Sequence, residues 1–86
     1  MSIRRIFTIL DDLRGKEHIA IFAAGQRGRD ILKVAKLLDV SIECFIDSDK
    51  RLQGQTIGGV PVVSLEKAGN IRYFINASYK IGRAHV

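Results

Sequence analysis

The fold expected for this chain is decided by one stretch, His18-Ile19-Ala20-Ile21-Phe22-Ala23 followed by Ala24-Gly25-Gln26-Arg27-Gly28. The first six residues are an apolar run without alternation, which is typical of a strand covered on both faces of a parallel sheet. A glycine-containing turn comes next. After it, apolar residues at helical spacing predict a helix over roughly residues 27–38; they are Ile31, Val34, Ala35 and Leu38.

Two more apolar runs predict two more strands, at residues 41–46 and 72–77. Between them, residues 53–63 hold three glycines and the single proline, and we expect a loop with a short extended piece around Pro61. Ser64 is expected to cap a brief helix that ends by about Ala68. Because strands alternate with helical segments, the sheet is expected to be parallel, with about three strands.

The N-terminal segment predicts an additional helix over residues 3–14. Its apolar residues recur at helical spacing, Ser2 can cap its start, and Gly15 can end it; the apolar residues are Ile3, Ile6, Phe7, Leu10 and Leu13. If no helix follows the third predicted strand, part of one sheet face would be bare. We expect the N-terminal helix to cover some of that face.

Composition limits the function classes. The 86 residues carry a net charge of +5, but the basic residues are scattered and form no run, so neither a basic tail nor nucleic-acid binding is expected. The single cysteine, Cys44, excludes an internal disulfide, and no Cys/His/carboxylate cluster has metal-ligand spacing. No signal peptide or membrane span is apparent, so a cytoplasmic location is expected by default.

The turn after the first predicted strand has the pattern A-x-G-x-x-G, at Ala23, Gly25 and Gly28. A helix N-terminus offers unpaired N–H groups and partial positive charge, so a strand turning into a helix can aim both at a phosphate. Gly25 is expected where the backbone approaches the phosphate, and Gly28 where the helix packs closely on the strand. Asp47 follows at about the spacing of a ribose-binding carboxylate.

Each of these residues also has a purely structural interpretation. The glycine turn could simply join strand to helix, and the Cβ of Ala23 restricts that turn. Asp47 and Asp49 could bind a ribose or base, or could stabilise their own turn. Arg27 could reach a phosphate or face solvent.

The carboxyl end of the third predicted strand, Asn76-Ala77-Ser78, lies at the edge where open α/β sheets bind ligands, and the small Ala77 and Ser78 would leave room for one. His18 precedes the first strand and is therefore at the wrong end for a catalyst. No nucleophile–base pair and no acid–base carboxylate pair stands out, so no catalytic residue is assigned.

As a set, the glycine turn, the strand end Phe45-Ile46-Asp47-Ser48-Asp49 and the segment Ile57-Gly58-Gly59-Val60-Pro61-Val62 resemble a known domain type. It is the small nucleotide-binding domain at the N-terminus of bacterial polysaccharide and glycan biosynthesis proteins, found ahead of sugar O-acyltransferases, nucleotide-sugar dehydratases and some glycosyltransferases and methyltransferases. The resemblance covers about residues 18–78. It implies an α/β fold, namely a truncated Rossmann-like three-layer fold with a short parallel sheet and an extra N-terminal helix.

The resemblance also implies a ligand, a nucleotide sugar, with NAD as the other possible cofactor. The expected binding residues are Ala23, Ala24, Gly25, Gln26, Arg27, Gly28, Asp47, Ser48, Asp49, Ala77 and Ser78. The family usually has glycine where this chain has Ala23, a departure that bears on ligand affinity rather than on fold.

Three functions follow as hypotheses. The first is a nucleotide or nucleotide-sugar binding module, the N-terminal fragment of a larger sugar-modifying transferase whose catalytic domain is missing. The second is a truncated NAD-dependent nucleotide-sugar dehydratase or dehydrogenase, and the third a ligand-free structural or oligomerisation domain. The expected division is residues 1–16 for the N-terminal helix, 17–80 for the binding half-domain, and 81–86 for a tail that looks like a translated sequencing adapter.

Overall fold

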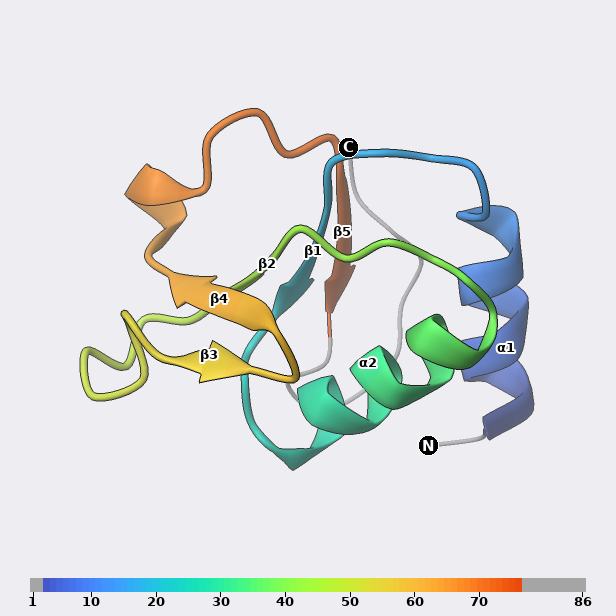
Figure 1. The fold of residues 1–86 in the computed structure, drawn as a ribbon, viewed down its shortest axis with the longest axis horizontal. Coiled ribbons are helices and arrows are strands. Elements are labelled where there is room, and N and C mark those ends of the chain that lie inside the picture. Colours follow the sequence, from blue (N-terminus) through green and yellow to red (C-terminus); the bar gives the residue numbers. More distant parts are fainter. Residues whose placement is uncertain (1–2, 77–86) are drawn as a thin grey trace.

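The computed structural model describes residues 3–76, which form a five-stranded sheet, two α-helices and one short 3₁₀ helix (Figure 1). In chain order the elements are α1 (Ile3–Asp12), β1 (Ile19–Phe22), α2 (Gln26–Leu37), β2 (Cys44–Ile46), β3 (Thr56–Ile57), β4 (Val60–Val63), η1 (Leu65–Lys67) and β5 (Tyr73–Asn76). Both helices and the three strands expected from the apolar runs are confirmed, and β1, α2 and β5 end within one residue of their predicted bounds.

The strands lie side by side in the order β3-β4-β2-β1-β5. β1 pairs in parallel with both β2 and β5, and β2 pairs in parallel with β4. The chain therefore builds the sheet outward from β1 in one direction, through β2 to β4, and then returns to place β5 on the other side of β1. Such a reversal leaves a crevice at the carboxyl ends of the strands, where open α/β sheets bind their ligands.

The expectation of about three strands, all parallel, is wrong, because residues 56–63 form a hairpin instead of a loop. β3 runs antiparallel to β4, with Thr56 opposite Pro61 and Ile57 opposite Val60. Gly58 and Gly59 make the turn with φ values of +58° and +83°, the left-handed pair that a two-residue type I′ hairpin requires. The Lys36 ammonium donates a 2.6 Å hydrogen bond to the Gly58 carbonyl, which ties the hairpin to α2.

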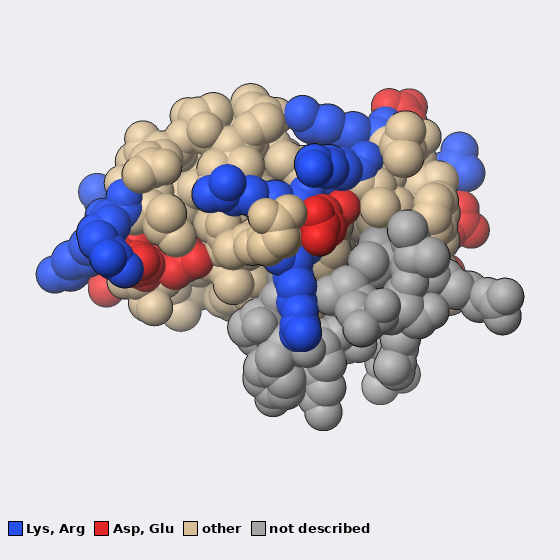
Figure 2. Space-filling view, turned by 90° about the horizontal axis from the view of Figure 1, so that it is seen from below, with Lys and Arg blue, Asp and Glu red and all other residues tan. Residues whose placement is uncertain are grey.

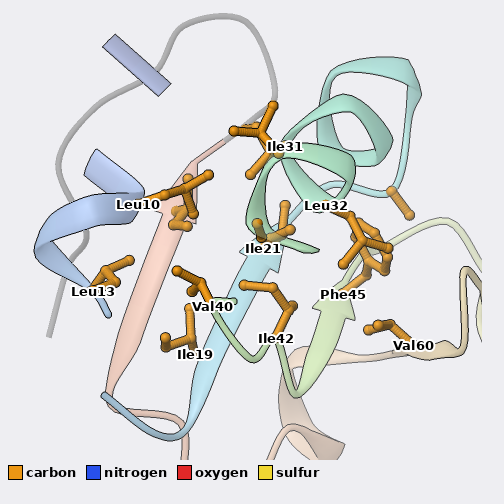
Figure 3. Close-up of a cluster of buried hydrophobic side chains, with 14 of the residues drawn as sticks. Leu10, Leu13, Ile19, Ile21, Ile31, Leu32, Val40, Ile42, Phe45 and Val60 are labelled. Carbon is orange, nitrogen blue, oxygen red and sulfur yellow. The ribbon is translucent and has the colours of Figure 1, made fainter. Parts of the chain in front are cut away.

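One face of the sheet is covered by both α-helices. Leu10 of α1, Leu13 directly after it and Ile31 of α2 pack in one cluster with Ile21 and Phe45 of the strands (Figure 3). The expectation that the N-terminal helix covers the sheet beside the last strand is confirmed, since Leu10 is fully buried in the cluster that includes Ile75 of β5. Burial of apolar side chains such as Leu10, rather than helix propensity, stabilises a helix as short as α1.

The opposite face is thinner. It presents the alternate residues of the same strands, among them Phe22 and Phe74, whose rings stack with centroids 4.8 Å apart. Within residues 3–76, the helix over this face is η1, and Ala68, the residue that ends it, is buried in the cluster. The described part of the chain thus lacks the second α-helical layer of the expected three-layer fold, because the connection from β4 to β5, residues 64–72, holds one 3₁₀ turn in place of an α-helix.

Cys44 belongs to this second cluster and is only 4% exposed. Burial, and secondarily the negative charge of Glu43, raises the pKa of the Cys44 thiol to about 11. The thiol is therefore protonated at neutral pH and packs as a small apolar side chain. No helix within residues 3–76 is long and apolar enough to cross a bilayer.

Candidate functional site

The turn from β1 into α2 places a helix N-terminus at the carboxyl edge of the sheet. Gly25 is the N-cap of α2, and no side chain donates or accepts a capping hydrogen bond there. A Cβ built on Gly25 meets no heavy atom within 4 Å among the described residues, so this backbone is open to a ligand. The first N–H groups of a helix in such a position attract anions.

Gly28 lies where the helix contacts the strand end most closely. A Cβ built on it overlaps the carbonyl oxygen of Ala23 and comes within 3.3 Å of the Phe45 ring. The predicted role of Gly28, close packing of helix against strand, is therefore confirmed, and a side chain of any size at this position has to displace backbone.

Ala23 adopts a left-handed conformation, with φ at +77°. Its N–H donates to the Ile46 carbonyl at 2.7 Å, and its own carbonyl faces Gly28, so the turn holds this residue on both sides. The left-handed region costs a residue with a Cβ about 1–2 kcal/mol, whereas glycine enters it freely. The restriction expected from Ala23 is thus present as backbone strain in the turn.

Replacing Ala23 with glycine is expected to raise the free energy of unfolding by about 1 kcal/mol, because relief of the strain exceeds the added flexibility of the unfolded chain. Urea denaturation measures the change. The matched control is Ala24→Gly, since Ala24 is fully buried and is not among the residues with positive φ. Ala24→Gly is expected to lower the free energy of unfolding by about 1 kcal/mol. Equal effects of the two substitutions would contradict strain at Ala23.

A hollow of about 880 Å³ adjoins the turn at the carboxyl ends of the strands. Its apolar wall includes Phe22, Ile46 and Leu65, and its charged side chains are Asp47, Lys50 and Glu66. The remaining lining residues are Ala23, Ser48, Gln53, Ser64 and Asn76. Concave sites of this size, mostly apolar with a few polar groups, are the usual sites for small ligands.

The structure brings most of the predicted binding residues to this edge, in two groups. Ala23, Asp47 and Ser48 line the hollow. Ala24, Gly25, Gln26, Arg27 and Gly28 form the adjoining turn and the first turn of α2. Ala77 and Ser78 lie outside the described residues.

Asp49 is not part of the hollow and instead stabilises its own turn. One carboxylate oxygen accepts from the Arg51 backbone N–H at 2.9 Å and the other lies 3.0 Å from the Arg51 guanidinium. These hydrogen bonds lower the pKa of the Asp49 carboxyl. Gln26 is likewise engaged on the helix surface, where its amide donates to Asp30 at 2.9 Å.

Sequence reasoning missed the wall that Lys50, Gln53, Ser64, Leu65 and Glu66 contribute. Lys50 and Gln53 follow β2, and the other three follow β4. The available signal was the Gly58-Gly59 pair, because recognising the hairpin identifies β4 as a strand and residues 64–66 as its carboxyl end.

The opposite edge of the sheet holds His18, as expected. It precedes β1, and its ring lies 3.0 Å from the Glu43 carboxylate, away from the residues that line the hollow. Among residues 3–76, no three His, Cys, Asp or Glu side chains come together to hold a metal ion.

Figure 2 views the molecule from the side toward which β1 and β5 point in Figure 1. Lysine and arginine side chains lie there in separate groups, with acidic and uncharged surface between them. Comparisons with protein families, curated proteins and solved structures found no match.

Proposed function

We propose that this chain is a nucleotide or nucleotide-sugar binding module with a Rossmann-like fold, the N-terminal part of a larger cytoplasmic enzyme of bacterial glycan biosynthesis. One observation supports it most: the strand order reverses at β1, and the open N-cap Gly25 and the hollow lie together at that point. This module binds the nucleotide or nucleotide sugar, and another domain of the parent transferase catalyses the reaction.

The charges at the site support one orientation of the ligand. The hollow is lined by two acidic side chains, Asp47 and Glu66, and one basic side chain, Lys50, so it disfavours phosphate. The N-terminus of α2 favours phosphate through its N–H groups and its dipole. The diphosphate therefore lies over Gly25, and the nucleoside occupies the hollow against Phe22 and Leu65.

A second function is favoured by Ala23. Its positive φ shows that the turn tolerates a residue that fits it poorly, which suits a domain that kept the fold and serves as a structural or oligomerisation element. A truncated NAD-dependent enzyme would bind NAD instead of a nucleotide sugar, and the titration below distinguishes the two.

The test is calorimetric titration of the chain with UDP, UDP-N-acetylglucosamine and NAD. Binding of the uridine ligands in preference to NAD supports the module, and the reverse supports the NAD enzyme. If none of the three binds, the result favours the structural element.

Gly25→Val is expected to lower the affinity for the bound nucleotide at least about tenfold, because its side chain fills the space over the helix N-terminus. Gly25 has φ −77° and ψ −167°, which valine adopts readily, so stability is expected to change by less than about 1 kcal/mol. The control is Lys16→Val, at the far edge of the sheet, which is expected to leave affinity unchanged. Equal affinities of the wild type and Gly25→Val would show that the phosphate does not bind at this turn.

A further inference from the structure

Asp47 has all four of its polar atoms engaged with the protein. Its N–H donates to the Val63 carbonyl at 3.1 Å, and its carbonyl accepts from the Gln53 side-chain amide at 2.8 Å. One carboxylate oxygen accepts from the Asp49 N–H at 2.9 Å, and the other accepts from the Ala24 N–H at 2.8 Å. A single residue thus joins the end of β4, the loop after β2 and the turn before α2.

We infer that Asp47 is a positioning residue that fixes the β1–α2 turn against the loop of residues 47–55, and that it does not read the ribose hydroxyls. Ser48, Lys50 and Gln53, which line the hollow, belong to this loop. The width of the site therefore depends on the Asp47–Ala24 bond. The ligand part of this inference rests on the proposed function.

The strength of these bonds explains why the ribose is not the partner. A carboxylate that accepts from backbone N–H groups makes charge-assisted hydrogen bonds, about twice as strong as neutral ones. The fold holds both N–H groups in place. A ribose hydroxyl would have to displace one of them from the carboxylate, or share a carboxylate oxygen with it, and would also lose its own hydration. Binding is then expected to be nearly indifferent to the two ribose hydroxyls.

The first experiment needs no ligand. Asp47→Asn keeps the shape of the side chain but has only one acceptor oxygen, so Ala24 and Asp49 cannot both keep their bonds. We expect amide hydrogen exchange at one or both of these residues to accelerate at least about tenfold. Asp49→Asn is the matched control, since it removes the charge facing Arg51 and is expected to leave Ala24 exchange within about twofold. Unchanged exchange at both Ala24 and Asp49 in Asp47→Asn would overturn the positioning role.

The second experiment compares UDP and ADP with their 2′,3′-dideoxy analogues. In the wild type, each pair is expected to bind within about threefold, and Asp47→Asn is expected to weaken both members by the same factor, on the order of tenfold. A wild-type preference for the ribose forms above about tenfold that disappears in Asp47→Asn would show direct contact and overturn the inference. If that variant does not fold, the wild-type ratio decides. If no nucleotide binds, the proposed function fails, and the exchange experiment still decides the positioning role.

Discussion

Replacing Gly28 with alanine is expected to lower the free energy of unfolding by at least about 2 kcal/mol. The new Cβ overlaps the Ala23 carbonyl oxygen and presses on the Phe45 ring, which is itself fully buried. Overpacking of this kind costs about 1–3 kcal/mol and more where backbone has to move, and the better helix propensity of alanine recovers only about 1 kcal/mol. Urea denaturation at constant pH measures the loss.

Gly25→Ala is the matched control for Gly28, because it adds the same methyl group three residues earlier in open space. It is expected to change stability by less than about 1 kcal/mol, the usual range for an N-cap exchange. If the two alanine variants unfold at the same urea concentration, the close approach of helix and strand at Gly28 is absent in solution.

Truncating Leu10 to alanine is expected to cost about 3 kcal/mol, the second large effect. Leu10 is fully buried between α1 and the sheet, and removal of a buried leucine loses transfer free energy and leaves a cavity. Thermal and urea unfolding measure it. A loss of this size is a large fraction of the stability of so small a domain.

Phe7→Ala provides the comparison on the same helix, since Phe7 is 38% exposed. It is expected to cost less than half as much as Leu10→Ala, even though phenylalanine is the larger side chain. Similar losses at the two positions, or a Leu10 variant as stable as the wild type, would mean that α1 does not pack on the sheet as described.

The sequence was sufficient to predict the central unit of the fold. The apolar run at 18–23, the glycine turn and the helical spacing of Ile31, Val34 and Ala35 all reflect local rules, and β1 and α2 follow them. The same holds for α1, whose apolar residues at helical spacing predicted the helix; Leu10 and Leu13 are buried, whereas Phe7 is 38% exposed.

The hairpin of β3 and β4 differs from the predicted loop because Gly58, Gly59 and Pro61, residues that usually interrupt regular structure, here form the turn and part of a strand. Two adjacent glycines between Ile57 and Val60 make a tight hairpin turn, and pairing of β4 with β2 then depends on contacts far apart in the sequence. The glycine pair could have predicted the hairpin and so the additional strands, but single-sequence patterns do not contain the pairing of β4 with β2 that brings residues 64–66 to the wall of the hollow.

The positions of the candidate site residues along the backbone could be predicted, but the hydrogen bonds of their side chains could not. Spacing placed Gly25, Gly28 and Asp47 at one edge, as the structure has them. What spacing could not supply was the direction of each polar group: Asp47 bonds to Ala24, and Asp49 pairs with Arg51. The bond of Asp49 within its own turn was among the interpretations left open by the sequence, whereas the bond from Asp47 to Ala24, 23 residues away, was not.

In the proposed function, the N–H groups at the start of α2 bind the phosphates of a nucleotide at the carboxyl edge of the sheet. The most direct measurement is the change in backbone amide chemical shifts as UDP is added to the ¹⁵N-labelled chain. Saturable shifts are predicted at Gly25, Gln26 and Gly28 and at Ser48 in the hollow, with none at Lys16 and His18 on the far edge. Saturable binding that shifts the far edge and leaves the Gly25–Gly28 amides unmoved would contradict the claim.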